Sequence, residues 1–169
     1  MSQSYLSGGD SWQDLGGSKY GAQSFWLTED HVLRYIDLEL DSQVRNRYPE
    51  VKVYFADLNG HPIPPALTFS RKATGAPNDT RIPYRCRVSM KPFTLKIGLF
   101  YVMVVHTHGL RNWYNQRWQY HKDTATYLHG WRLHSGDNGE TWAEDWGDDH
   151  MFAEFGNPPV FEVPYNPPP

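Results

Sequence analysis

The feature that most constrains this chain is a series of short segments in which apolar and polar residues alternate. From Ile82 to Met90 every second residue is apolar, and arginines and a serine stand between them. The segments Val32–Leu40 and Val51–Asp57 alternate in the same way. Because successive side chains of a strand point to opposite faces of a sheet, this period of two predicts half-buried β-strands.

Further strands are expected between these segments, and no segment has a sustained helical period with capping residues. We expect them at residues 22–27, 67–69, 93–95, 100–105, 113–120, 126–133 and 151–155. The strand at 100–105 is apolar on both faces, as a central strand should be. Short strands separated by turn signals predict an all-β fold, specifically an antiparallel jelly-roll β-sandwich. The single cysteine, Cys86, falls on the apolar side of its strand and is expected to be an inert core residue.

The two ends of the chain differ in composition from the middle. Residues 1–20 are rich in Ser, Gly and Asp and are expected to form an N-terminal arm, while residues 21–156 form the sandwich. Residues 157–169 are rich in proline, which favours an extended C-terminal arm carrying Phe161 and Tyr165 as contact residues. Such an arm can dock on its own sandwich or on a neighbouring subunit, and we favour the neighbour.

Charge and apolar runs exclude several classes of partner. The formal net charge of −3 gives no strong attraction to nucleic acid or to an anionic membrane. The N-terminus lacks the basic and apolar regions of a signal peptide, and the run Leu99–Val105 is too short to cross a bilayer. We therefore expect a soluble protein made in the cytoplasm, with no nucleic-acid partner and no membrane contact. Aromatic residues make up 15% of the chain, which suits sheets and interfaces.

The stretch Ser135–Trp142 has the outline Ser-x-Asp-x-Gly-x-Thr-Trp. Asp137 can accept bonds from the backbone that follows it, and Asn138 and Gly139 tolerate positive φ, so a hairpin is expected. Trp142 should fold back onto a core. The pattern matches the Asp-box of sialidases and many other β-proteins, in which it is generally structural. We expect Ser135, Asp137, Gly139 and Trp142 to form a structural hairpin, and one copy indicates no sialidase activity.

The order of these segments resembles a jelly-roll domain found in phage structural proteins and secreted bacterial surface proteins. The first half of the resemblance lies in Gln23-Ser24-Phe25, Leu33–Leu40, Val51–Phe55 and Asn59-Gly60-His61-Pro62. The second half lies in Met90–Leu95 with Gly98 and Tyr101–Val105, then in the Asp-box hairpin and Asp148–Gly156. Leu99 departs from the threonine usual in that family. The resemblance covers about residues 21–156 and implies a domain that binds or displays, without catalysis.

The most suggestive surface in the sequence is the stretch Trp113–Tyr120, because it combines aromatic rings with amides and an arginine. Such residues pack in cores, form protein-interface hot spots, or stack on sugar rings, and all three readings are open. The candidate ligand- or partner-binding residues are Trp113, Tyr114, Gln116, Arg117, Trp118 and Tyr120, together with Phe161 and Tyr165.

Two groups are weak candidates for metal binding. His106 and His108 have a spacing that places both rings on one face of a strand, where a further histidine or carboxylate could complete a zinc site. The acidic group Glu140, Glu144, Asp145, Asp148 and Asp149 could hold Ca²⁺, although a solvated acidic edge is the simpler reading. No metal or other cofactor is otherwise expected.

Three functions follow from these patterns. The first is a non-enzymatic virion or assembly protein, such as a phage capsid-decoration, head–tail or tail component, that forms a homo-oligomer and docks on neighbouring virion proteins through its arms. The alternative is a carbohydrate-binding module that recognises surface glycans through Trp and Tyr. A small hydrolase is the least favoured, because the sequence has no nucleophile motif, phosphate loop or paired acids with defined spacing.

Overall fold

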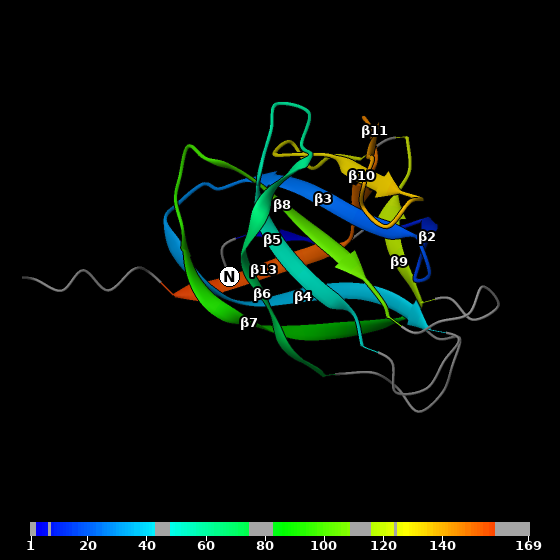
Figure 1. Cartoon of the computed structure of the whole chain (residues 1–169), viewed down its shortest axis with the longest axis horizontal. Coiled ribbons are helices and arrows are strands. Elements are labelled where there is room, and N and C mark those ends of the chain that lie inside the picture. The colour runs from blue at the N-terminus through cyan, green and yellow to red at the C-terminus, as the bar shows by residue number, and fades with distance from the viewer. Residues whose placement is uncertain are drawn as a thin grey trace, which may run out of the picture.

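The computed structural model describes residues 3–6, 8–42, 48–74, 83–108, 116–123 and 125–157. These residues form antiparallel β-strands and contain no helix, so the predicted all-β class is confirmed (Figure 1). No helix long and apolar enough to cross a membrane is found among them. The strands are β1 (Gln3–Tyr5), β2 (Ser11–Leu15), β3 (Tyr20–Trp26), β4 (His31–Ser42), β5 (Glu50–Ala56), β6 (Pro62–Thr74), β7 (Tyr84–Leu95), β8 (Phe100–His106), β9 (Gln116–His121), β10 (Arg132–Ser135), β11 (Ala143–Asp145), β12 (Asp149–His150) and β13 (Phe152–Asn157).

The strands make one sheet that curls over on itself, in the order β1-β13-β4-β7-β6-β5-β8-β3-β10-β11. The curl occurs at β6, since its beginning pairs with β5 at Ile63 and its end pairs with β7 from Ser70 onward. We call β1, β13, β4 and β7 the β4 half, and β5, β8, β3, β10 and β11 the β8 half. A branch of β9, β2 and β12 is attached to the end of β4, where Leu40 lies opposite Trp118.

The core lies between the two halves and follows the alternation seen in the sequence. From the β4 half it receives Ile36, Leu38 and Leu40, and from the β8 half Phe25 and Tyr101, all at most 1% exposed. Burying one such side chain stabilises the fold by about 1.5–3 kcal/mol. Cys86 is fully buried in this cluster, which confirms its predicted core position, and burial raises its thiol pKa to about 12.

The outward side of the β4 half is a ladder of ion pairs. The acids Asp37, Glu39 and Asp41 alternate along β4, and the arginines of neighbouring strands reach them from either side. Arg87 binds both carboxylate oxygens of Asp37 at 2.7 and 2.8 Å, Arg85 binds Glu39 at 2.8 Å, and Arg117 pairs with Asp41. This side is therefore charged, with its charges matched in pairs, and Arg87 and Arg117 cover the buried carboxylates of Asp37 and Asp41.

Three segments differ from the sequence expectations. Residues 3–5 and 11–15, expected in an irregular arm, are β1 and β2, which pair with β13 and β9 of the same chain. The strand expected at 67–69 extends over Pro62–Thr74, because its prolines fall where β6 pairs only with β5. The strand expected at 126–133 is wrong, since β10 begins only at Arg132. The proline-rich segment 158–169 lies outside the described residues.

Candidate functional site

The outward side of the β8 half is rich in aromatic residues, unlike the charged outward side of the β4 half. Every second residue of β3, β5 and β8 points outward, which brings together Tyr20, Trp26, Tyr54 and Phe100. Loop residues Trp131, Trp142 and Trp146 join them. We call these seven residues the outer aromatic face. Small apolar residues of the strands, such as Ala22 and Val102, form a buried layer beneath the rings.

Four of these rings form a continuous row at one end of the face. Ring centroids are 4.5 Å apart for Trp26 and Phe100, 5.3 Å for Phe100 and Trp131, and 4.3 Å for Trp131 and Trp146. The row is open to solvent, since Trp26 is 43% and Trp146 66% exposed. Large aromatic rings left in water next to one another are a common sign of a binding surface.

The turn between β5 and β6 borders this row and adds polar groups to it. Gly60 has φ +82°, and a Cβ there would lie 3.1 Å from the Trp131 indole, so this close approach requires glycine. The Trp131 indole N–H donates to the carbonyl of Asn59 at 3.1 Å. His61 in the same turn contacts the Glu144 carboxylate at 2.7 Å. A ligand on the row would therefore meet hydrogen-bonding groups at its edge.

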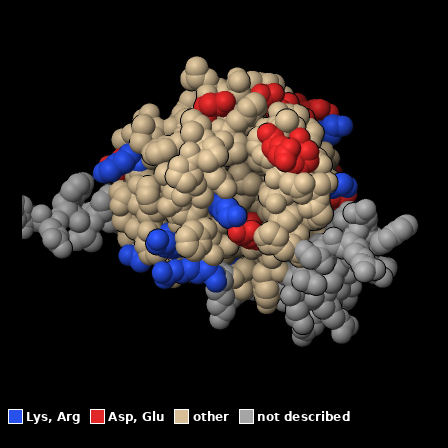
Figure 2. Space-filling model, viewed as in Figure 1, with Lys and Arg blue, Asp and Glu red and all other residues tan. Residues whose placement is uncertain are grey.

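A pocket of about 140 Å³ continues the face beyond the row. It is lined by Tyr20, Tyr54, Pro62, Pro64, Val104, Asn138, Gly139 and Trp142. In Figure 2 most basic side chains lie toward the lower left and most acidic ones toward the upper right, and both kinds also occur near the middle of this face, whereas the residues that line the pocket carry no charged side chain. The pocket thus offers rings and prolines rather than charge.

The Asp-box hairpin forms one wall of this pocket and has the structure expected from its sequence. The Asp137 carboxylate accepts from the backbone N–H and the hydroxyl of Thr141, at 3.0 and 2.5 Å, and from the Ser135 hydroxyl at 2.7 Å. The bonds from Thr141 and Ser135 lower the pKa of Asp137 to about 2. Asn138 and Gly139 have φ of 66° and 83°. Every polar function of Asp137 therefore serves the hairpin.

The stretch predicted as a binding strand is only partly a surface. Trp118 is fully buried, stacks on His150 at 3.7 Å and donates its indole N–H to the Met151 carbonyl, so it cannot form a ligand platform. Gln116 is also fully buried. Arg117 pairs with Asp41, and Tyr120 lies beneath the Arg132 guanidinium at 4.0 Å. Trp113, Tyr114, Phe161 and Tyr165 lie outside the described residues.

The acidic group considered for Ca²⁺ is not gathered around one point. Asp145 and Asp148 both bind Arg132, at 2.7 and 3.1 Å, and Glu144 binds His61. Asp149 is buried and accepts from the Gln23 amide at 2.8 Å. These acids serve internal hydrogen bonds and ion pairs in the described structure, and Ca²⁺ binding by them stays a prediction.

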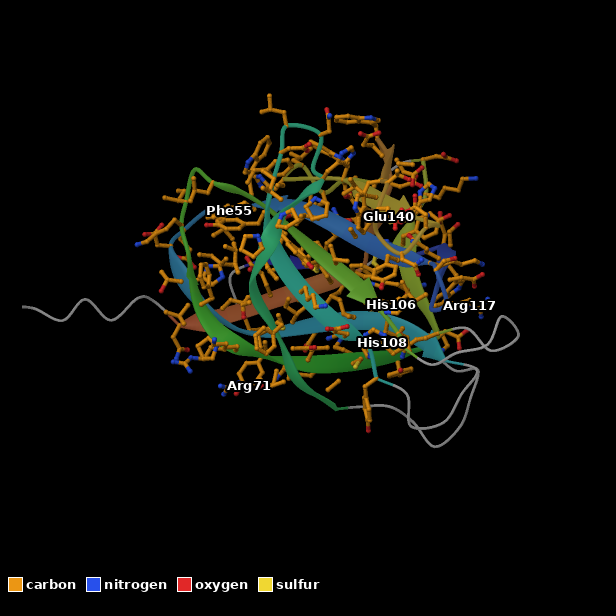
Figure 3. The ribbon with its side chains drawn as sticks, in the orientation of Figure 1. Phe55, Arg71, His106, His108, Arg117 and Glu140 are labelled. Atoms are coloured by element: carbon orange, nitrogen blue, oxygen red, sulfur yellow. The ribbon has the colours of Figure 1, made fainter. Side chains whose placement is uncertain are left out.

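The histidine pair does come together, and a carboxylate joins it. His106 is the last residue of β8, and Glu50, the first residue of β5, lies directly opposite it in the sheet. The rings of His106 and His108 meet edge to face with centroids 4.6 Å apart. Figure 3 shows both histidines at the same end of β8. The sequence pointed to the histidines and left the third group undetermined; Glu50 supplies it.

No family model, curated protein or solved structure matches this chain. The candidate sites therefore rest on the geometry of the chain itself. The sequence patterns did not predict the outer aromatic face. Alternation alone does place Trp26 on the other side of its strand from Phe25, and Phe100 on the other side of its strand from Tyr101. What alternation does not tell is which side of the β8 half faces the core.

Proposed function

We propose that this chain is a non-catalytic carbohydrate-binding module of the jelly-roll kind, with the outer aromatic face as its platform. The observation that carries the proposal is the continuous row of four rings, from Trp26 to Trp146, on the outward side of the β8 half. The apolar face of a sugar ring stacks on an aromatic ring, and a row of rings suits successive sugars of a chain.

Three further features support this function. The pair His61 and Glu144 lies beside the row and can exchange hydrogen bonds with sugar hydroxyls. The pocket at Tyr20, Tyr54 and Trp142 is large enough for a substituent of a sugar rather than for a drug-sized ligand. The face rests on β3, β5 and β8, which are paired on both sides, so the rings are held on a rigid support.

The bonding of the carboxylates near the face is consistent with a binding role without catalysis. A glycosidase needs two carboxylates that face each other across a cleft and remain available to substrate. In the described part of the chain, Asp137 is occupied by Thr141, Asp145 and Asp148 by Arg132, and Glu144 by His61. This supports a module that holds a glycan and does not cleave it.

The test is a glycan array followed by calorimetry with the best ligand. Trp26→Ala and Trp146→Ala should each weaken binding by roughly 2- to 10-fold, because one aromatic contact contributes about 0.5–1.5 kcal/mol. The double variant should weaken it further. Tyr35→Ala is the matched control, since Tyr35 is 42% exposed but lies on the β4 half. No glycan retained on the array, or equal losses in the control, would overturn the proposal.

The second candidate is the virion or assembly protein indicated by the sequence resemblance. One feature of the fold favours it. At the end of the β8 half, beside the turns that follow β5 and β7, apolar side chains are left exposed: Phe55 39%, Leu58 94%, Ile63 47%, Ile97 58% and Leu99 43%. Such a group suits contact with another protein subunit. The two functions are compatible, because an assembled surface protein can also bind glycans.

A further inference from the structure

The cluster of Glu50, His106 and His108 has the composition and geometry of a metal site. One ligand atom from each of the three residues lies within 4.8 Å of the other two. Glu50 and His106 are register partners on β5 and β8, and His108 follows two residues later. Two paired strands and the residue just beyond one of them therefore hold the ligand atoms together.

The hydrogen bonding of His106 leaves one ring nitrogen ready to bind a cation. Its Nε2 lies 3.1 Å from the carbonyl of Gly17, and because a carbonyl only accepts, Nε2 must carry the proton and donate. Nδ1 then carries a lone pair. His106 is only 5% exposed, so water does not reach this atom freely. Among the described residues the atom has no hydrogen-bond partner. A buried acceptor without a partner destabilises the fold, and a bound cation would give it one.

The bond from His106 to Gly17 is also the kind of support that metal-binding histidines have. A ligating histidine usually donates its other N–H to a carbonyl or carboxylate, which fixes both tautomer and ring orientation. The ring of His106 is further held by Tyr20, which stacks on it at 3.9 Å with an interplanar angle of 7°. The imidazole is thus oriented before any ligand arrives.

The other two residues are arranged to complete a site that is open to solvent. Lys52 holds one oxygen of Glu50 at 2.9 Å, while the other oxygen lies 2.5 Å from Nε2 of His108. The side chain of His108 is 70% exposed and can move, whereas His106 is fixed. Tetrahedral Zn²⁺ ligands stand roughly 3.4 Å apart, so a shift of about 1 Å by the His108 side chain would bring its Nε2 to that spacing from the Glu50 oxygen.

We propose that Nδ1 of His106, Nε2 of His108 and the carboxylate oxygen of Glu50 nearest His108 bind Zn²⁺ or a similar divalent transition metal. Two imidazoles and one carboxylate favour such an ion over Ca²⁺ or Mg²⁺, which prefer oxygen ligands. On binding, the metal replaces the hydrogen bond between Nε2 of His108 and Glu50, so both atoms must be unprotonated, and the proton between them moves to Nδ1 of His108 or to solvent. A fourth position remains for water or for an oxygen of a ligand.

The experiment uses the full chain without a histidine tag, freed of metal with a chelator. Zn²⁺ affinity is measured by calorimetry, and Co²⁺ is used as a visible probe because its absorption is intense in a tetrahedral site and weak when it is octahedral. We expect one ion per chain, a tetrahedral Co²⁺ spectrum, and a rise in melting temperature with Zn²⁺.

Ligand and control variants then locate the site. His108→Ala and Glu50→Gln should each lower Zn²⁺ affinity by more than the roughly 10- to 100-fold that loss of a supporting residue causes, and should abolish the tetrahedral spectrum. The matched control is His129→Ala. His129 is exposed, and its carbonyl accepts from the backbone N–H of Trp26, which places it at the other end of β3 from Tyr20. Wild-type protein that binds no Zn²⁺, or variants that bind it as the wild type does, would overturn the proposal. Because exposed His108 and half-buried Glu50 carry the test, it does not depend on the folding of a His106 variant.

Discussion

Asp149 is an acid whose environment favours its protonated form. It is 2% exposed, and its carboxylate accepts from the Gln23 side chain. Burial, with a smaller contribution from the charge of nearby Asp148, raises the pKa of Asp149 to about 7, although its hydrogen bonds act in the opposite direction. The same network includes His150, whose backbone N–H donates to Gln23 at 2.8 Å and whose ring contacts Gln13 at 2.9 Å. Asp149, Gln23, His150 and Gln13 therefore form one hydrogen-bonded network in the interior.

The raised pKa of Asp149 predicts a stability that depends on pH. Because the folded-state pKa is above the unfolded value of 3.8, the contribution of this group is fully present below about pH 4 and is lost as the pH rises through about 7. Asp149→Asn keeps an oxygen for Gln23 and removes the charge. The difference in unfolding free energy between Asp149→Asn and the wild type should therefore shift in favour of the variant by roughly 2–4 kcal/mol between pH 5 and pH 8.5.

Urea unfolding of both proteins at the two pH values measures this difference. The exposed residue Glu140 provides the control, and Glu140→Gln should show the same offset from wild type at both pH values. If the offset of Asp149→Asn is also constant, then Asp149 is ionised in the folded protein at pH 5 and the account given above is wrong.

At the scale of elements, the Asp-box hairpin connects strands that would otherwise be too short to hold their place. It joins β10 to β11 and is fastened to the neighbouring turn, where the backbone N–H of Asn138 donates to the Ser18 carbonyl at 3.0 Å. Trp142 packs on the apolar layer beneath the outer aromatic face. The hairpin therefore shapes a wall of the pocket, and its role in binding is indirect.

Asp137→Ala should loosen this hairpin. Removing the carboxylate leaves the Thr141 N–H and hydroxyl without their partner, so we expect the melting temperature to fall by about 2–4 °C. Because the pKa of Asp137 is lowered to about 2, its contribution is present above its unfolded value of 3.8 and is lost only as the pH falls through about 2. The effect should therefore persist at pH 5.

The neighbouring exposed residue in the same loop, Glu140, gives the control through Glu140→Ala, which should melt as the wild type does. Calorimetric melting at pH 7 and pH 5 checks both expectations. An Asp137→Ala protein with an unchanged melting temperature would mean that the backbone bonds of the hairpin suffice without the carboxylate.

The sequence predicted those strands in which alternation and burial agree. Apolar residues fill the buried side or sides of five strands, so the alternation of these strands could be recognised in the sequence: β3, β4, β5, β7 and β8. β2 was missed because its inward residues include Gln13, which is buried by bonding to Arg132 and His150. Tyr127 falls in the strand predicted at 126–133 but packs edge-on against Phe152 from a loop, with centroids 5.4 Å apart. A single sequence does not tell which buried polar residues face each other.

The same limit applies to the candidate sites. Alternation predicted that the rings of His106 and His108 lie together, and they do, although β8 ends at His106; Glu50 joined them only through the pairing of β5 with β8. For Trp118 the sequence left core and surface both open, and the fold decides for the core because the branch of β9 covers the end of the two halves. Residue type indicated chemistry, and strand order decided position.

At the scale of the whole molecule, the surface has three distinct regions. The β4 half is covered by paired charges, the β8 half by the outer aromatic face, and one end of the β8 half by the exposed apolar residues beside its turns. Protein partners bind through surfaces of apolar residues with a polar rim, whereas matched ion pairs on a solvated sheet contribute little. The apolar end is therefore the surface at which self-association is expected.

If the chain assembles through this end, wild-type protein should elute as an oligomer in size-exclusion chromatography with light scattering. Ile97→Lys and Leu99→Asp place charges in the contact and should shift the protein to monomer without lowering its melting temperature, because both side chains are exposed. Tyr48→Lys is the control, since Tyr48 is 45% exposed and precedes Glu50, at the other end of β5 from Phe55. A wild-type protein that is monomeric at all concentrations would exclude assembly through this surface.

The path of β6 has a consequence for how the molecule loses its structure. One end of β6 belongs to the hydrogen-bonded ladder of β5 and the other to that of β7, so the same strand is a member of both layers. Neither layer can be pulled away as an intact subdomain without breaking β6 itself. Under mechanical load or in native-state hydrogen exchange, the two layers should therefore fail together as a single cooperative unit.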